Sequence, residues 1–351
     1  MSPAQETRNM LRKYAAAYPY MQPRDLLKYL FHSSFGCDHM VSPDAPVAER
    51  ITSEWARLGG APLTELLPGE KYARVHLGWL GKGLRADTLA KMFRMSARAE
   101  ENGAADLEEK LTVATELVRE GVFSFDEPAL LSELEPWRAA GYPAIHHSEV
   151  FRQAYQPAYR VVDARSAQYL PLLARIDADL LAKGRLRLAI EGGSASGKST
   201  LANLLQSIYG CAVVHADDFF LQPHQRTAER FSQPGGNLDR ERLLEEVLIP
   251  ASKGNTVRFR CFDCSTMTLG QWKELPDTPL TVIEGAYSMH PELSDYYDLS
   301  VFLDVLPEEQ ARRIRLRNTP AIAERYLTEW VPMEKRYFEH YDIKNRCDLV
   351  I

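Results

Sequence analysis

The chain has 351 residues, of which 45% are hydrophobic and 26% charged. This is an ordinary globular composition with enough apolar material for two domains. The formal net charge of −6 offers no general attraction for a nucleic-acid backbone, and no segment approaches the ~20 apolar residues of a membrane span. We therefore expect no nucleic-acid and no membrane partner. Five scattered cysteines and a polar start predict a cytoplasmic protein. A homo-oligomer is left open.

Residues 1–160 are predicted to form an all-α domain whose role the sequence does not indicate. Apolar residues recur at helical spacing, without β-alternation of useful length, in segments 24–35, 46–58, 87–95, 106–120 and 127–140. In the turn after the first of these, Cys37 and His39 could ligate a metal, but no second ligand pair accompanies them. A helix end explains that turn better.

Residues 161–351 are predicted to form an α/β domain, because strand-like and helical runs alternate along this half. The domain boundary is placed near residue 160. The expected strands are 186–190, 212–215, 280–283, 299–303 and 348–351. The expected helices are 198–208, 239–249, 307–317 and 320–339. Apolar strands of this kind predict a parallel sheet that is buried on both faces.

A glycine-rich loop follows the first of these strands and precedes a helix. Its residues are Gly192-Gly193-Ser194-Ala195-Ser196-Gly197-Lys198-Ser199-Thr200. Strand, loop and helix in this order predict a phosphate-binding P-loop, or Walker A motif. The backbone N–H groups and the helix N-terminus would hold the phosphates of ATP. Lys198 would reach the β- and γ-phosphates, and Ser199 would bind Mg²⁺.

Acidic residues follow two other predicted strands, where the carboxyl ends of a parallel sheet gather functional groups. Asp217 is the predicted acceptor-side carboxylate, which takes the proton of the acceptor hydroxyl and touches the Mg²⁺ shell. Asp218 is expected to cap the next segment. Glu284 is predicted to reach Mg²⁺ directly or through water. The metal set is thus Ser199, Asp217 and Glu284.

Four arginines crowd one predicted helix end, at positions 312, 313, 315 and 317. Arg313 and Arg317 are the predicted catalytic lid residues on the phosphates, and a merely solvated basic face is the alternative.

The acceptor pocket is harder to place. Asp239 is either a helix N-cap or a contact to acceptor hydroxyls. Arg258, Arg260 and Asp263 lie in a long irregular connection of the kind that binds substrates, and Tyr287 follows a strand end. Cys261 and Cys264 of the same connection form half of a zinc motif, and no second half lies nearby.

From about residue 183 to 351 the chain resembles the uridine kinase and phosphoribulokinase family of P-loop kinases. The resemblance rests on the P-loop, His215-Ala216-Asp217-Asp218-Phe219-Phe220, Gly236-Asn237-Leu238-Asp239, Cys261-Phe262-Asp263, Ile283-Glu284-Gly285 and the arginines of 312–317. The first half resembles helical domains of unknown role that accompany some bacterial kinases.

The resemblance implies a Mg²⁺-dependent phosphotransferase with a mobile lid, which moves the γ-phosphate of ATP to an alcohol group. It gives Lys198, Asp217 and Glu284 the roles named above, and makes Asp239 an acceptor contact. Uridine kinases carry a histidine and an arginine after an aromatic–Asp–aromatic stretch, and segment 262–267 has neither. The acceptor therefore stays open among nucleosides, sugars and polyols.

The alternative is a P-loop ATPase or a nucleotide-binding regulatory module without small-molecule kinase activity. No Asn-Lys-x-Asp guanine motif occurs in the chain, and segment 283–285 lacks the Asp-Glu pair of motor ATPases. The intact Lys198, Ser199, Asp217 and Glu284 favour the kinase.

Overall fold

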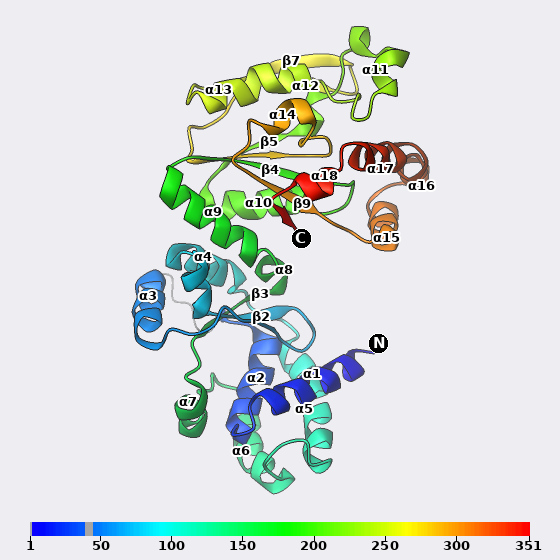
Figure 1. Cartoon of the computed structure of the whole chain (residues 1–351). Coiled ribbons are helices and arrows are strands. Elements are labelled where there is room, and N and C mark those ends of the chain that lie inside the picture. Colours follow the sequence, from blue (N-terminus) through cyan, green and yellow to red (C-terminus); the bar gives the residue numbers. More distant parts are fainter. Residues whose placement is uncertain (1, 39–44) are drawn as a thin grey trace. The chain divides into compact units, whose positions relative to one another are not determined.

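The computed structural model describes residues 2–38 and 45–351, so that His39 of the candidate metal pair lies outside the described residues. The chain divides into two compact units, the first ending at Asp177 and the second beginning at Ala178 (Figure 1). The division lies later than the predicted boundary near residue 160. The reason is strand β3 (Tyr159–Asp163), which pairs with β2 (Tyr72–His76) and so belongs to the first unit.

The first unit is mainly helical, as predicted. Its helices are α1 (Pro3–Ala17), α2 (Pro23–Phe35), α3 (Val47–Leu58), α4 (Ala86–Ser96), α5 (Gly103–Arg119), α6 (Glu127–Ala139), α7 (Glu149–Tyr155) and α8 (Ala164–Ala167). Helix α9 (Leu170–Lys183) crosses the division between the units. The core of the unit lies between α2 and its neighbours α1, α5 and α6, and ten residues of α2 from Asp25 to Ser34 are buried.

The first unit also contains a small antiparallel sheet, which the all-α expectation did not include. Its strands are ordered β1 (Thr64–Leu66), β2 and β3. Strand β2 is buried at four successive positions, from Tyr72 to Val75. A short strand that is buried on both faces lacks the alternation of apolar and polar residues that reveals a strand in a sequence.

The second unit is built on the predicted five-stranded sheet. The strand order is β10 (Leu349–Val350), β9 (Leu299–Leu303), β4 (Leu186–Gly192), β8 (Leu280–Glu284) and β5 (Ala212–His215), with parallel pairing throughout. Ala189 lies opposite Ile283 on one side and Ser300 on the other. The carboxyl ends of β4, β5 and β8 therefore lie side by side.

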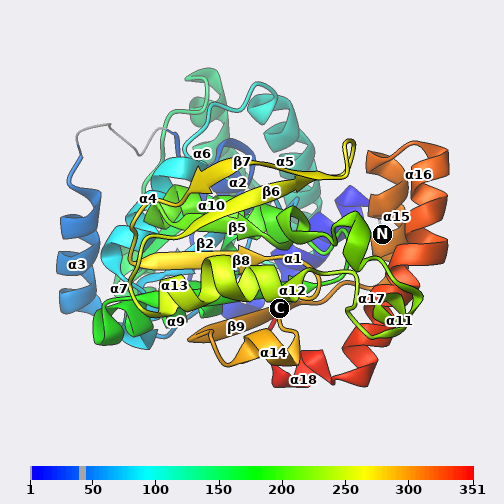
Figure 2. The same cartoon turned by 90° about the horizontal axis from the view of Figure 1, so that it is seen from above.

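Helices cover both faces of this sheet. Helix α10 (Lys198–Tyr209) packs on one face, and the run from α12 (Arg240–Leu243) through a π-helical turn (Leu244–Leu248) to α13 (Ile249–Ser252) lies on the other (Figures 1 and 2). The remaining helices are α11 (Ala228–Ser232), α14 (Pro291–Ser294), α15 (Pro307–Arg317), α16 (Pro320–Arg325), α17 (Val331–His340) and α18 (Ile343–Arg346).

The connection predicted to be irregular forms a hairpin of β6 (Arg258–Asp263) and β7 (Thr268–Glu274). Every one of the five cysteines lies in the described part of the chain, and none forms a disulfide. Among the described residues, none of the helices has the length and apolar character that crossing a membrane requires.

Candidate functional site

The glycine-rich loop joins β4 to α10, as the sequence predicted. Gly192 has a φ of +144°, and a Cβ there would come within 2.6 Å of the Leu303 carbonyl oxygen. Only glycine fits this position without displacing β9. Ala195, at the top of the loop, has a φ of +62°, which L-residues with side chains seldom adopt. Left-handed residues among right-handed ones turn successive backbone N–H groups toward one centre, which suits an anion.

Contacts from α15 hold the loop from outside. Gln310 Nε2 donates to the Ser194 carbonyl at 2.9 Å, and Arg313 Nη1 donates to the Ala195 carbonyl at 3.2 Å. Lys198 Nζ folds back over the loop and donates to the carbonyls of Gly192 and Gly193, both at 2.9 Å. The lysine therefore lies at the loop, with its charge satisfied by backbone oxygens.

A cavity of about 430 Å³ opens over the loop. It brings together the predicted groups Lys198, Ser199, Asp217, Glu284 and Arg317. The full lining is Ser194, Ala195, Gly197, Lys198, Ser199, Thr200, Asp217, Glu284, Gly285, Ala286, Arg317, Asn318, Tyr326 and Glu334. The five predicted groups come from four separate parts of the chain. Lys198, Ser199, Asp217 and Glu284 lie at or after the carboxyl ends of β4, β5 and β8, which the parallel sheet places together.

Glu284 is the centre of a short hydrogen-bonded chain at this edge. Its Oε1 accepts from Ser199 Oγ at 3.0 Å and lies 2.6 Å from His215 Nδ1. Burial raises the pKa of Glu284, but the bond from His215 and the charge of Lys198 outweigh burial and leave this pKa below its ordinary value. The same bond raises the pKa of His215. Glu284 is thus ionised beside the Ser199 hydroxyl.

Asp217 lies in the 3₁₀ turn Ala216–Phe219 that follows β5. Burial raises the pKa of Asp217, and the positive charge of Lys198 opposes that shift. A carboxylate with a raised pKa is a better proton acceptor than an ordinary aspartate. This is the electrostatic setting that a general base for an acceptor hydroxyl needs.

Glu191 is a buried carboxylate that the sequence analysis treated only as the end of a strand. It is fully shielded from solvent and accepts from the backbone N–H groups of Gly192 and Met289, both at 2.9 Å. Tyr337 Oη donates at 3.1 Å to Oε2, the same oxygen that accepts from Met289 N. Burial raises the pKa of Glu191 to about 7. Its position directly after an apolar strand, like those of Asp217 and Glu284, was the signal for it.

Glu334 of α17 was also missed, since nothing in the local sequence marks it. Its carboxylate accepts from Ser194 N at 2.9 Å and from Ser194 Oγ at 2.6 Å, and it lines the loop cavity. Burial raises the pKa of Glu334, and the Ser194 bonds counter this. Helix α17 is thus hydrogen-bonded directly to the P-loop.

The arginine cluster has acidic partners, which the sequence analysis did not assign. Glu309, one turn earlier in α15, binds Arg312 at 2.6 Å and Arg313 at 2.7 Å. Of the predicted lid residues, Arg313 contacts the loop and Arg317 lines its cavity, whereas the guanidinium of Arg312 binds Glu309.

Asp239 has the capping contact that was one of its two alternatives. It is 1% exposed, and its Oδ1 accepts from Arg242 N at 3.2 Å at the start of α12. Tyr287 is buried, has a φ of +77° and packs edge-on against Tyr337. Neither side chain is among the groups that line the two cavities described for this unit.

The other three predicted substrate residues lie on the β6–β7 hairpin. The guanidinium groups of Arg258 and Arg260 lie 5.7 and 5.2 Å from the ring centre of Trp272. Asp263 accepts from Ser265 N at 2.8 Å in the exposed turn. These side-chain contacts are within the hairpin, whereas the backbone of Arg260 also binds Arg242 and Glu246. None of the three lines either of the two cavities described for this unit.

A second cavity of about 540 Å³ is lined by residues of the run from α16 into α17, of the segments after β5 and of the turn between β6 and β7. Its lining is Phe220, Leu221, Arg226, Phe231, Asn237, Cys264, Met267, Arg325, Glu329, Trp330 and Met333. Asn237 Oδ1 is buried there without a hydrogen-bond partner in the described part of the chain. An unsatisfied amide oxygen at a cavity wall is suited to accept from a ligand hydroxyl.

No metal cluster of three or more His, Cys, Asp or Glu side chains occurs in residues 2–38 and 45–351. Mg²⁺ in nucleotide sites needs fewer protein ligands, because phosphates and water complete its octahedron.

Comparison with known proteins agrees with this geometry. Residues 188–318 match the family model described as the Phosphoribulokinase / Uridine kinase family. The uridine kinase of Clostridium novyi (strain NT) is 27% identical over 181 residues, which are 47% of this chain and 85% of that protein. The dephospho-CoA kinase of Thermosynechococcus vestitus is 27% identical over 164 residues, 43% of this chain and 81% of that protein.

Among solved structures, one described as a possible uridine kinase from Bacillus stearothermophilus is 24% identical, with a TM-score of 0.38, and the match covers 48% of this chain and 88% of that one. The sequence relatives are both kinases, which supports a phosphotransferase and implies that the site binds ATP. Over residues 188–318 the second unit is similar to the P-loop kinases of the phosphoribulokinase and uridine kinase family.

Proposed function

We propose that the protein transfers the γ-phosphate of ATP to a hydroxyl group of a small acceptor in the nucleoside, sugar or polyol class. The observation that carries the proposal is the loop cavity, where the P-loop, Lys198, Asp217 and Glu284 meet. A P-loop alone implies nucleotide binding. A buried carboxylate of raised pKa beside that loop adds what an alcohol acceptor requires.

The residues have distinct roles in this mechanism. The loop N–H groups and Lys198 hold the phosphates, and Lys198 exchanges its two carbonyl contacts for phosphate oxygens. Asp217 accepts the proton of the acceptor hydroxyl as the oxygen attacks phosphorus, and the leaving ADP carries away the electron pair of the broken bond. Arg313 and Arg317 face the charge that spreads over the transferred group.

The donor set beside the loop fits Mg²⁺. Ser199 Oγ and an ionised Glu284 lie 3.0 Å apart, and Asp217 lines the same cavity. These are hard oxygen ligands of the type that Mg²⁺ prefers. When bound, the ion neutralises charge on the phosphate oxygens. His215 keeps Glu284 ionised and orients it, which is a positioning role.

The second cavity is the proposed acceptor site. Phe220, Phe231 and Trp330 give it aromatic walls, and Asn237 supplies the unsatisfied acceptor oxygen. Apolar walls with a few polar groups suit a compact ring with hydroxyl substituents. Among the three acceptor classes this favours nucleosides, whose base presents a flat apolar face. This cavity replaces Asp239, Arg258, Arg260, Asp263 and Tyr287 as the proposed source of acceptor contacts.

The test is a panel of nucleosides, pentoses, polyols and hydroxy acids with Mg-ATP, followed by acceptor-dependent ADP formation and by phosphorus NMR of the product. Lys198→Ala should abolish transfer to any acceptor that the panel finds. Asn237→Ala should raise the KM of that acceptor and leave the KM of ATP unchanged, whereas Asn255→Ala, at an exposed position of the same unit, should change neither.

The rival function is a P-loop ATPase or a regulatory module without transfer. ADP formation that no acceptor stimulates, with release of inorganic phosphate, would favour the ATPase.

The predicted location is the cytoplasm, in keeping with five cysteines that form no disulfide.

A further inference from the structure

The first unit contains a cavity of its own, of about 320 Å³, which the proposed kinase function does not use. It lies between α2, α3 and the segment that leads into α7. Its lining is Lys28, Glu54, Arg57, Leu58, His146, His147, Arg152, Gln156 and Pro157. Three of these residues, Lys28, Arg57 and Arg152, are basic, and the lining contains a single carboxylate, that of Glu54.

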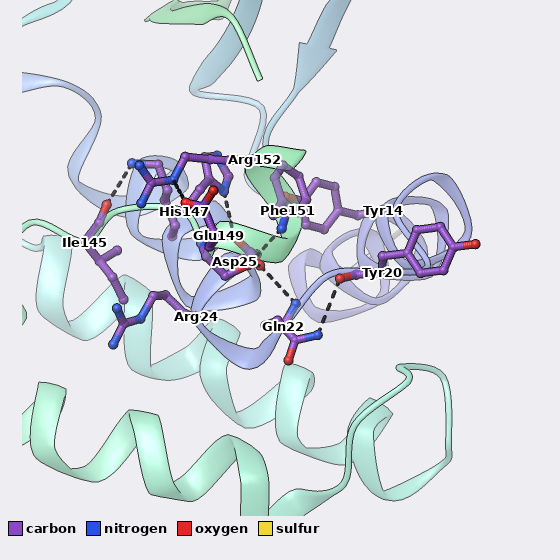
Figure 3. Close-up of polar contacts among 12 residues, drawn as sticks. Tyr14, Tyr20, Gln22, Arg24, Asp25, Ile145, His147, Glu149, Phe151 and Arg152 are labelled. Atoms are coloured by element: carbon purple, nitrogen blue, oxygen red, sulfur yellow. Dashed lines mark hydrogen bonds and ion pairs between the residues drawn. The ribbon is translucent and has the colours of Figure 1, made fainter. Parts of the chain in front are cut away.

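One wall of this cavity is fixed by Asp25, which is fully buried in the first turn of α2. Asp25 accepts from His147 Nδ1 at 2.8 Å, from Ser148 N at 2.9 Å and from Ser148 Oγ at 2.6 Å. Figure 3 shows His147 and Arg152, from the segment leading into α7 and from α7 itself, beside Asp25. The carboxylate of Asp25 is thus fully hydrogen-bonded to His147 and Ser148.

Lys28 lies one turn further along α2 and is 8% exposed. Its Nζ donates to the Ile145 carbonyl at 2.8 Å. No carboxylate of residues 2–38 or 45–351 forms an ion pair with it. A buried ammonium group costs free energy unless a counter-charge accompanies it, and one carbonyl leaves two of its three N–H donors to other partners.

The only carboxylate in the lining is already engaged. Glu54 binds Arg160 Nη2 at 2.7 Å. Arg57 forms no ion pair within the described part of the chain, and the exposed Glu149 lies 3.7 Å from Arg152. The cavity therefore presents Lys28, Arg57 and Arg152 with little compensating charge.

A further cation lies in the core of the same unit. Arg74 of β2 is 1% exposed, and its guanidinium lies 4.9 and 4.6 Å from the ring centres of Tyr29 and Tyr159. Glu65, at 3.5 Å, is its acidic partner. Burial lowers the pKa of Lys28 to about 8, and repulsion from Arg74 adds to the shift while Asp25 opposes it. An anion bound at Lys28 would offset both the cost of burying its ammonium group and the repulsion from Arg74.

We propose that this cavity binds a small phosphate-bearing anion, with Lys28 at its floor and Arg57 and Arg152 at its rim. Three cations match the double negative charge of a phosphate ester better than the single charge of a carboxylate. Guanidinium groups bind phosphate oxygens through paired N–H donors. The volume admits a phosphate with a small organic group attached.

The test uses the full-length chain with Lys198→Ala, which weakens phosphate binding at the P-loop. Inorganic phosphate and glycerol 3-phosphate are titrated by calorimetry, and the two probes distinguish free phosphate from an ester. Adding Lys28→Met should weaken binding by about tenfold or more, the usual effect of losing a hydrogen bond to a charged group. Arg57→Gln changes an exposed residue that folding does not need, and should weaken binding several-fold.

Lys13→Met is the matched control, because Lys13 is exposed in α1 of the same unit, and this variant should bind like its parent. A second readout is proton uptake at pH 8. The charged and titratable groups around Lys28 are Asp25, Arg74, His146, His147, Glu54, Arg57 and Arg152. The pKa of Lys28 is lowered to about 8, whereas burial lowers the pKa of His147 to about 4. Phosphate should therefore draw up to about half a proton onto Lys28, and Lys28→Met should remove that uptake.

The proposal is overturned if no binding is found at millimolar phosphate, or if Lys28→Met and Arg57→Gln bind as tightly as Lys13→Met. Acetate that binds as tightly as phosphate would overturn the phosphate class. Unchanged binding by both Lys28→Met and Arg57→Gln together with a loss in a Ser196→Trp variant would place the anion at the P-loop and also overturn the proposal.

Discussion

Each unit of the chain has a cavity with buried charge, and the two cavities differ in how that charge is balanced. In the second unit, Lys198 shares its cavity with the carboxylates of Asp217, Glu284 and Glu334. In the first, Lys28, Arg57 and Arg152 share theirs with Glu54, which binds Arg160. A mixed site can hold a metal together with phosphates, whereas an unbalanced basic site suits an anion alone.

The difference also lies in how each cavity is assembled. The groups of the second unit follow β4, β5 and β8, and parallel pairing places those strand ends together. The groups of the first unit come from helices α2, α3 and α7 and from the loop before α7, and Lys28 and Arg152 are more than a hundred residues apart in the sequence. Fold topology explains the cavity of the second unit, and only tertiary packing explains the cavity of the first unit.

After substitution of the proposed base Asp217, the largest expected effect tests the mixed character of the loop cavity. Glu284→Gln should lower transfer by on the order of 10- to 100-fold and raise the Mg²⁺ concentration for half-maximal rate, because an amide keeps the shape but loses the charge beside Ser199. Rates are measured over a Mg²⁺ series. Glu274→Gln, on the exposed hairpin, should behave like the parent. An unchanged Mg²⁺ dependence in Glu284→Gln would remove this residue from the metal site.

The next effect contrasts the units by the pH dependence of their stability. Glu191 has a pKa raised to about 7, so the folded state binds its proton more tightly than the unfolded state does. Its contribution is full below the unfolded pKa of about 4.5 and is lost as the pH rises through 7. The loss is on the order of 3 kcal/mol.

His147 in the first unit gives the opposite sign. Burial lowers its pKa to about 4, so its contribution is full above about 6.5 and is lost as the pH falls through 4. Urea unfolding at a series of pH values measures both slopes. Glu191→Gln should flatten the loss between pH 4.5 and 7, and His147→Gln the loss between 6.5 and 4. Exposed neighbours supply controls in Glu245→Gln and His146→Gln. Slopes that are the same in parent and variants would contradict these assignments.

A smaller effect separates the two alternatives for Asp239. As an N-cap of α12, its loss in Asp239→Ala should cost about 1 kcal/mol of unfolding free energy and leave the acceptor KM unchanged. Asp126→Ala removes a comparable cap from α6 in the first unit and should cost about the same. A raised acceptor KM at full stability in Asp239→Ala would restore the role of an acceptor contact.

Much of the second unit could be predicted, because its signals are local. The P-loop lies between a strand and a helix as expected, and the five strands match their predicted segments within a few residues. Glu334 could not be predicted, since it reaches Ser194 from 140 residues away. Asn237 was quoted only as part of a motif, because its unsatisfied oxygen depends on the packing around it.

The first unit was predicted only as a set of helices. Strand β2 escaped notice because it is buried on both faces, and β1 is three residues long. Helix α1 was not expected either, since its sequence is largely polar; Leu11 and Tyr14 are two of its few buried residues. Nothing in the local sequence marks Lys28, because its burial against Ile145 follows from tertiary packing.

The most direct test of the kinase assignment is Asp217→Asn, measured for ATP affinity and for turnover of an acceptor found by the panel. The substitution keeps the shape of the side chain and removes its ability to accept a proton. We predict that turnover falls by about 10²- to 10⁴-fold while ATP affinity stays close to that of the parent. Turnover at the parent level would contradict the assignment of Asp217, and with it the central claim that this cavity performs phosphoryl transfer to an alcohol.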